Sequence, residues 1–216
     1  MKVIGINGGP RKKWNTHQML ESALKGCSDA GAETKLYHLF DLKFKGCCSC
    51  FGCLKLGGPS YGKCAMRDEL TPVLDDILSA DVLIMGSPIY FYDVTADMRA
   101  LLERLCFAGL SYAKDRRILY NRRFPVKIIF TTNAPTFAFH THLNETVTNL
   151  MTRFIGPTEL IEANGTWQFD DYSKYEAGMF NVEERKKRRE EGFPQDLQNA
   201  YDMGRRAVAE AEAGVE

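Results

Sequence analysis

The chain has 216 residues, of which 44% are apolar and 26% charged, a composition typical of a globular protein with a sizeable core. Its 28 Lys and Arg residues equal its 28 Asp and Glu residues in number, so no net field attracts nucleic acid or an anionic membrane, and we expect neither as a partner. The N-terminal MKVIGINGGP has too short an apolar run for a signal peptide or a membrane span, which predicts a cytoplasmic protein. In that reducing compartment seven cysteines, an odd number, indicate thiols or metal ligands rather than a disulfide framework.

Strand-like and helix-like segments alternate along the chain. In chain order the pattern predicts a strand at 3–6, a helix through 19–27, a strand at 34–39, a helix from 71, a strand at 80–85, a helix at 94–105 capped by Thr95, a strand at 126–131, a helix at 143–154, a strand at 159–163 and a closing helix at 197–208. Parallel strands need crossover helices between them. The pattern therefore predicts an α/β fold: a doubly wound five-stranded parallel sheet with helices on both faces.

We expect one domain over residues 1–216, with two departures from the alternation. A cysteine-rich insertion occupies about 41–67, and an excursion without a strand or a clean apolar stripe occupies about 166–193. The excursion ends in EERKKRREE, whose four acids and five bases pair mostly at spacings of three and four, as on a solvated helix face.

The loop GINGGPRKKWNT, between the first strand and the first helix, has the features of an anion site. Backbone N–H groups at a helix start lack intrahelical acceptors and lie at the positive end of the helix dipole. Arg11 adds a charged donor, and Asn15 and Thr16 add polar side chains. Neither GxxxxGK[ST] nor GxGxxG is present, which disfavours a P-loop and a resident NAD. A glycine-rich turn without a ligand is the alternative.

The segment GSPIYF follows the third predicted strand. Proline directs the chain out of the strand, and Ile89, Tyr90, Phe91 and Tyr92 offer apolar faces to a flat heterocycle. Aromatic residues at this position also occur as core or oligomer contacts, the interpretation we favour for Tyr92. For Tyr90 and Phe91 the position after a strand favours a ligand.

Three segments carry a resemblance to a known family. GGPRKKWNT is similar to the GSPRxxGNT loop of the flavodoxin-like NADPH-dependent FMN reductase superfamily, and SPIYFYDVTADMRALLERL is similar to its SPIYFxxVTxxMKxFLDRL segment. CCSCFGCLKLGGPSYGKCAMRDEL resembles the cysteine loop of the iron-sulfur flavoprotein branch. Together they cover most of residues 3–107. Gly9 stands where the family usually has serine, and Trp14 where it usually has glycine.

The resemblance implies a flavodoxin-like fold that binds FMN at the carboxyl ends of the strands. It assigns residues to the cofactor by position. The phosphate is assigned to Gly9, Arg11, Asn15 and Thr16, the border of the isoalloxazine ring to Pro88, Ile89, Tyr90 and Phe91, and an approach from the loop after the fourth strand to Asn133.

Five cysteines lie within eighteen residues, and Cys47, Cys50, Cys53 and Cys64 form a CxxCxxC run with a delayed fourth member. This spacing is close to that of a [4Fe-4S] cluster, although ten residues separate the third and fourth cysteines. A tetrahedral zinc site and a metal-free loop of structural or redox-active thiols are the alternatives. Cys27 and Cys106 lie on apolar helix faces and are expected in the core.

We therefore predict an FMN-dependent oxidoreductase that transfers electrons from NAD(P)H or a reduced carrier to a small acceptor or electron carrier. No catalytic side chain is expected, because the flavin carries the chemistry and the protein positions it. A non-enzymatic flavodoxin-like carrier is the alternative from another class, and a zinc-bearing interaction module is a third. The family implies a homodimer or homotetramer.

Overall fold

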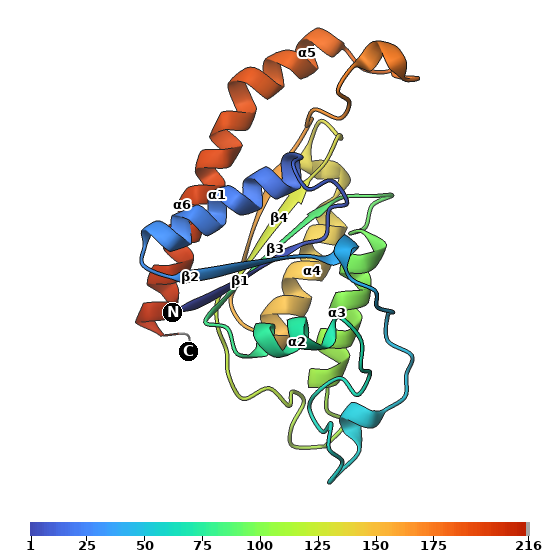
Figure 1. The fold of residues 1–216 in the computed structure, drawn as a ribbon, viewed down its shortest axis with the longest axis vertical. Coiled ribbons are helices and arrows are strands. Elements are labelled where there is room, and N and C mark those ends of the chain that lie inside the picture. Colours follow the sequence, from blue (N-terminus) through green and yellow to red (C-terminus); the bar gives the residue numbers. More distant parts are fainter. Residues whose placement is uncertain (215–216) are drawn as a thin grey trace.

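The computed structural model describes residues 1–214, and its centre is a five-stranded parallel sheet (Figure 1). The strands are β1 (Lys2–Asn7), β2 (Glu33–His38), β3 (Val82–Pro88), β4 (Val126–Thr131) and β5 (Thr158–Ala163). They lie in the order β2-β1-β3-β4-β5. The predicted doubly wound sheet is confirmed.

Helices cover both faces of the sheet. On one face lie α1 (Asn15–Asp29) and α6 (Phe193–Ala213), and on the other α2 (Thr71–Leu78), α3 (Ala96–Gly109) and α4 (Thr141–Phe154) (Figure 1). The alternation of strand side chains divides the core accordingly. Leu83 and Ile128 pack toward α2–α4, whereas Ile84 and Ile129 pack toward α1 and α6.

Two glycines bring α1 and α6 into unusually close contact. A Cβ atom at Gly26 would lie 2.1 Å from the carbonyl oxygen of Tyr201, and one at Gly204 would lie 2.0 Å from that of Ala23. The thiol of Cys27 donates to the carbonyl of Gly204 at 3.2 Å. The position of α6 is therefore fixed on α1 by backbone-to-backbone packing.

The terminal helix begins earlier than its apolar stripe indicated. Helix α5 (Val182–Lys187) passes through a π-helical turn, Arg188–Gly192, directly into α6. The side chain of Asn181 accepts from the amide of Glu184 and caps α5, and Phe193 is buried at the junction. Gly192 and Pro194 are both poor helix formers, so the sequence pattern concealed this continuity.

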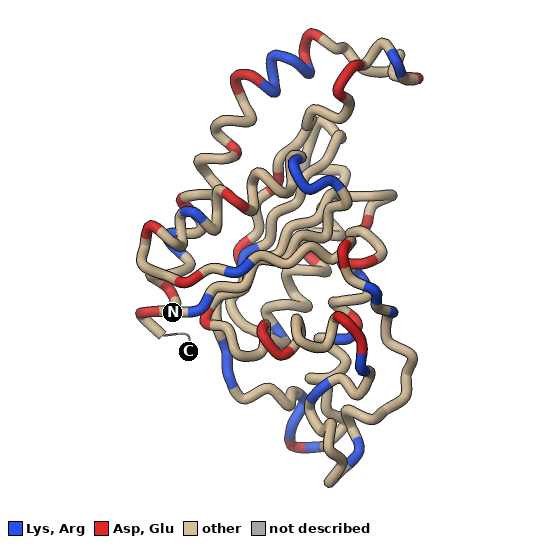
Figure 2. Tube along the Cα trace, viewed as in Figure 1, with Lys and Arg blue, Asp and Glu red and all other residues tan. Residues whose placement is uncertain are grey.

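The cysteine-rich segment forms a long loop beside the C-terminal half of α3, away from the carboxyl ends of the strands (Figure 1). Its one regular element is a short 3₁₀ turn, Gly52–Leu54. Acidic and basic residues are interspersed over the helices, and the sheet interior carries few of either (Figure 2). Among residues 1–214, no helix is long and apolar enough to cross a membrane.

Candidate functional site

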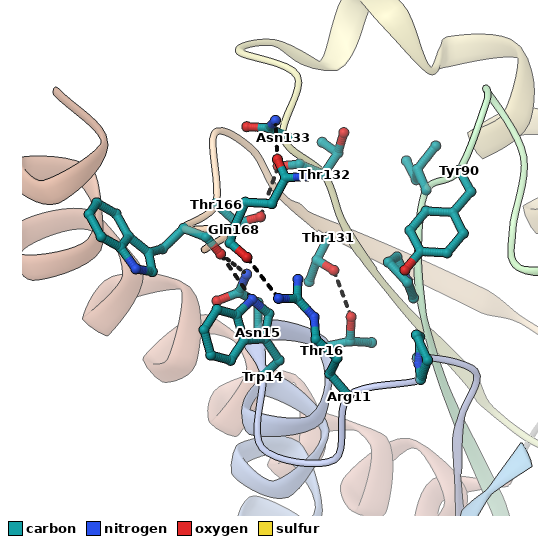
Figure 3. A pocket seen from close by; sticks show the side chains of 15 residues that line it. Arg11, Trp14, Asn15, Thr16, Tyr90, Thr131, Thr132, Asn133, Thr166 and Gln168 are labelled. Carbon is teal, nitrogen blue, oxygen red and sulfur yellow. Dashed lines mark hydrogen bonds between the residues drawn. The ribbon is translucent and has the colours of Figure 1, made fainter. Parts of the chain in front are cut away.

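A pocket opens at the carboxyl ends of β1, β3 and β4 (Figure 3). It gathers every predicted cofactor-binding residue except Phe91. Those that line it are Gly9, Arg11, Asn15, Thr16, Pro88, Ile89, Tyr90 and Asn133. The three loops that the sequence singled out therefore meet at one place, as expected where parallel strands end together.

The first turn of α1 forms one wall of the pocket. Trp14 occupies the N-cap position without making a side-chain cap hydrogen bond, and the first turn has no acidic residue. The first amides of the helix therefore keep free donors beside the positive end of the dipole. Thr16 is buried here, and its hydroxyl hydrogen-bonds that of Thr131 at 2.7 Å. This donor set fits a phosphate group.

Gly9, which the resemblance assigns to the phosphate, has its backbone amide engaged within the chain. Its N–H donates to Oδ1 of Asn7 at 2.8 Å, so it is already satisfied. A Cβ atom at this position would lie 3.1 Å from the same oxygen and 3.4 Å from Cδ of Pro88. The glycine lets the loop after β1 lie against the end of β3.

Arg11 extends into the pocket and is held by the segment that follows β5 (Figure 3). Its Nη1 donates to the carbonyl of Gln168 at 2.7 Å, and its guanidinium lies 4.3 Å from the ring centroid of Trp14. Burial lowers the pKa of Arg11, with partial compensation from Tyr90 and Asp170. Trp14, whose role the sequence did not reveal, also donates from Nε1 to the carbonyl of Trp167 at 3.1 Å.

The residues after β3 form a tight turn that directs the side chains of Tyr90 and Phe91 to different places. The amide of Tyr90 donates to the carbonyl of Asp93, and the amide of Asp93 donates back. Phe91 and Tyr92, between them, have φ angles of 50° and 66°. This geometry directs Tyr90 to the pocket, opposite Asn15 and Gln168 (Figure 3). Phe91 is 100% exposed and does not line the pocket.

Asn133 lies at the far side of the pocket, in the loop after β4. Its Nδ2 donates to Oε1 of Gln168 at 2.5 Å. Its Oδ1 is buried and has no hydrogen-bond partner among residues 1–214. An unpaired buried acceptor is costly, so this oxygen suits an N–H group of a bound heterocycle.

The structure adds lining residues that sequence reasoning did not select. They are Pro10, Trp14, Thr131, Thr132, Thr166, Trp167 and Gln168. Thr131 is the last residue of the buried strand β4 and Thr132 follows it, and that position is a signal that would have found them. Trp167 and Gln168 lie in the excursion after β5 and carry no comparable signal.

The predicted metal ligands differ in their exposure to solvent. Cys53 is buried, Cys47 and Cys64 are half-buried and Cys50 is exposed. Within residues 1–214 no three His, Cys, Asp or Glu side chains are grouped so that they would hold a metal ion. The described thiols are therefore not grouped as metal ligands, and the four-cysteine site stays a prediction.

The surroundings of these thiols differ from one to another. Nε of the fully buried Arg104 lies 3.2 Å from Sγ of Cys64, and its Nη1 pairs with Asp68 at 2.6 Å. Burial, together with the nearby thiols of the same loop, raises the pKa of Cys53. Cys27 and Cys106 lie in the two cores, as predicted.

The strand order and the pocket define the class of protein. A sheet ordered β2-β1-β3-β4-β5 with its pocket at the carboxyl ends of the strands is a flavodoxin-like fold. The family profile described as NADPH-dependent FMN reductase matches residues 1–165. The chain belongs to this family.

The more similar relatives are iron-sulfur flavoproteins. One from Archaeoglobus fulgidus is 34% identical over 105 residues, which are 49% of this chain and 46% of the relative. One from Methanocaldococcus jannaschii is 36% identical over 104 residues, 48% of this chain and 51% of the relative. The matched region thus spans about half the length of each relative. These similarities confirm the superfamily and branch indicated by the motifs.

Solved structures share the fold at low sequence identity. An NAD(P)H:quinone oxidoreductase from Methanothermobacter marburgensis superposes with a TM-score of 0.69 at 16% identity, covering 95% of this chain and 98% of that one. An azoreductase from Bacillus anthracis gives 0.67 at 13% identity, covering 95% and 99%. At these identities the likeness shows the fold alone.

Proposed function

We propose that the protein is an FMN-dependent oxidoreductase that takes electrons from NAD(P)H or a reduced carrier and passes them to a small acceptor or electron carrier. The observation that carries this proposal is the pocket itself. An uncapped helix start with a buried hydroxyl lies at one side and a tyrosine ring at the other, and Asn133, whose Oδ1 is unpaired, lies at the far edge. Family membership supports FMN as the ligand.

The residues of the pocket divide the work of holding such a cofactor. Arg11, Asn15, Thr16 and the first amides of α1 would bind the phosphate. Pro88, Ile89 and Tyr90 would border the ring, and Asn133 Oδ1 would accept from its edge. Bound FMN supplies electron transfer in steps of one or two electrons. The protein would orient it toward a second substrate.

A direct experiment tests this assignment. Acid denaturation of the purified protein should release FMN, which absorbance and chromatography identify. An apo preparation should bind added FMN with quenching of flavin fluorescence. A colourless protein that does not bind added FMN would disprove the proposal.

The alternative is a non-enzymatic flavodoxin-like carrier. Anaerobic oxidation of NADH and NADPH, assayed with quinones, free flavin and carrier proteins as acceptors, separates the two. The enzyme predicts turnover with a small acceptor, whereas the carrier predicts reduction only by a protein partner. The balanced charge of the chain supports the enzyme, since carriers of this fold tend to be acidic.

We further propose that Cys47, Cys50, Cys53 and Cys64 bind a [4Fe-4S] cluster, which the names of the relatives support. The cysteine loop would have to adjust around it, because no three of these thiols are grouped as metal ligands among residues 1–214. Anaerobic purification followed by iron, sulfide, zinc and flavin analysis tests this, with Cys50→Ser as the variant that should lose iron and sulfide. Zinc in their place, or no metal, would contradict the assignment.

Assembly and location complete the proposal. We propose a homodimer or homotetramer, for which family membership is the support and light scattering the test. A cytoplasmic location agrees with seven cysteines that are all free thiols within residues 1–214.

A further inference from the structure

The charge pairing of the basic run predicted a solvated helix face. In the structure this run, which spans α5 and the π-helical turn, is only partly solvated. Lys186 and Lys187 are exposed, whereas Arg185 and Arg189, four residues apart, are partly buried and point toward the pocket walls. In Figure 2 this run lies along the upper part of the terminal helix, and Figure 1 shows that helix crossing α1. Both arginines lie outside residues 1–165, which the family profile matches.

Arg189 determines how the amide of Asn15 is oriented. Its Nη1 donates to Oδ1 of Asn15 at 3.0 Å, and its Nη2 donates to Oε1 of Gln18 at 2.9 Å. A guanidinium has no acceptor, so the atom of Asn15 that faces it must be the oxygen. The amide nitrogen of Asn15 is thereby directed the other way, where it donates to the carbonyl of Trp167 at 2.8 Å. An amide nitrogen carries two hydrogens, so Asn15 keeps a second donor on the side away from Arg189.

Arg185 acts in the same way on the opposite wall. Its Nη2 donates to the backbone carbonyl of Asn133 at 2.9 Å. Gly165, with a φ angle of 60°, makes room for it, since a Cβ atom there would lie 2.9 Å from Nη1 of Arg185. The arginine therefore supports the loop that carries the unpaired Oδ1 of Asn133.

Both guanidinium groups lie against aromatic rings, and the helix that carries them packs closely on α1. Arg189 lies 4.2 Å from the ring centroid of Phe193, and Arg185 lies 5.2 Å from that of Phe180. The close packing at Gly204 fixes the helix on α1. Neither arginine lines the pocket, so each acts through another residue.

We propose that Arg189 and Arg185 are positioning residues of the flavin site: Arg189 orients Asn15 for the phosphate, and Arg185 places Asn133 for the ring. The inference rests on the proposed function. Its specific consequence is that the terminal helix contributes to the preference for a phosphorylated flavin, because Asn15 lies at the uncapped start of α1. Riboflavin, which lacks the phosphate, is the matched probe.

The test compares dissociation constants for FMN and riboflavin, measured by fluorescence quenching on apo protein. Arg189→Met keeps the aliphatic contact with Phe193 but removes the donors, and should weaken FMN about tenfold while changing riboflavin less than about threefold. Arg185→Met should weaken both flavins by similar factors, leaving their ratio unchanged. Arg188→Met is the control, because Arg188 pairs with Asp196 on the same helix and should leave both constants as in the wild type.

A second variant guards against misfolding. Arg189→Lys keeps a cation and a long stem, and its FMN affinity should lie between those of the wild type and Arg189→Met. Unchanged FMN affinity in the folded Arg189 variants would overturn the phosphate role, and so would an equal loss of affinity for riboflavin. An equally large loss of FMN affinity in Arg188→Met would contradict a specific role for Arg189. A wild-type protein that binds neither flavin would overturn the proposed function and this inference together. If the wild type binds FMN and the Arg189 and Arg185 variants bind both flavins with the same constants as the wild type, only this inference is overturned.

Discussion

Substituting Gly204 by alanine tests whether α6 rests on α1 as closely as the structure indicates. The new Cβ atom would lie 2.0 Å from the carbonyl oxygen of Ala23, well short of an ordinary contact of 3.4 Å or more. Because the obstacle is backbone, no change of rotamer relieves it, and the helices must separate. Such a separation would loosen the packing of Ala200, Met203 and Ala207, all buried in this interface.

The expected magnitude follows from two opposed effects. Overpacking costs about 1–3 kcal/mol, and a clash with backbone belongs at the upper end of that range. Alanine is favoured over glycine within a helix by about 1 kcal/mol. The net loss is therefore about 2 kcal/mol, which for a chain of this length lowers the Tm by about 4–8 °C.

The assay is thermal unfolding of the apo protein in reducing buffer, followed by far-ultraviolet circular dichroism. Gly178→Ala is the matched control, since nothing lies within 4 Å of the added Cβ atom there, and its Tm should stay close to that of the wild type. The sign of the shift is decisive. A Tm of Gly204→Ala equal to or above that of the wild type would refute the close contact. The higher helix propensity of alanine would then determine the change in stability.

Three further outcomes are expected at other sites. Hydrogen bonds from Lys2, Lys35 and Tyr37 lower the pKa of Asp76. Its contribution to stability is therefore fully present above the unfolded carboxyl pKa near 4, declines below it and is lost only as pH falls through the lower folded-state pKa. Asp76→Asn should lower the Tm at pH 7 by the equivalent of about 1 kcal/mol, because solvent screens this partly exposed cluster, and the difference from the wild type should shrink steadily between pH 4 and pH 2. Tyr90→Ala should weaken FMN binding about tenfold in a fluorescence titration, whereas Phe91→Ala, fully exposed, should leave it unchanged; equal effects would contradict the assignment of the turn. Burial raises the pKa of Cys106 to about 12, so native-state alkylation at pH 8 with mass-spectrometric detection should label the exposed Cys48 and spare Cys106 until the protein is denatured.

The fold was predictable because its signals are local. Five apolar runs separated by helical stripes determine the alternation, and parallel pairing follows from the crossovers. Thr95 is an example at the level of one residue: it was expected as a helix cap, and its side chain accepts from the amide of Met98. The loops after β1 and β3 were recognisable for the same reason, since glycine, proline and aromatic residues follow the strands directly.

The remaining parts of the site were not predictable because they depend on contacts between distant segments. Gln168 is 157 residues from Arg11 along the chain, and no periodicity marks it as a partner. Phe91 was expected beside Tyr90, but the left-handed backbone of the turn, a conformation no residue pattern here announces, sends it to solvent. The delayed Cys64 likewise has its partner, Arg104, on a helix forty residues later.

The pocket therefore has two origins within one chain. Residues 1–165, which the family profile matches, provide the helix start, the tyrosine and the loop after β4. The segment after β5 provides Trp167 and Gln168. Arg185 and Arg189 of the terminal helix hydrogen-bond Asn133 and Asn15, which line the pocket. Gly26 and Gly204 pack α6 closely on α1, and the first turn of α1 faces the pocket. The packing of α6 therefore also determines where Arg189 meets Asn15. Proteins that share the family loops but differ after β5 should consequently share the flavin while differing in how tightly they hold its phosphate.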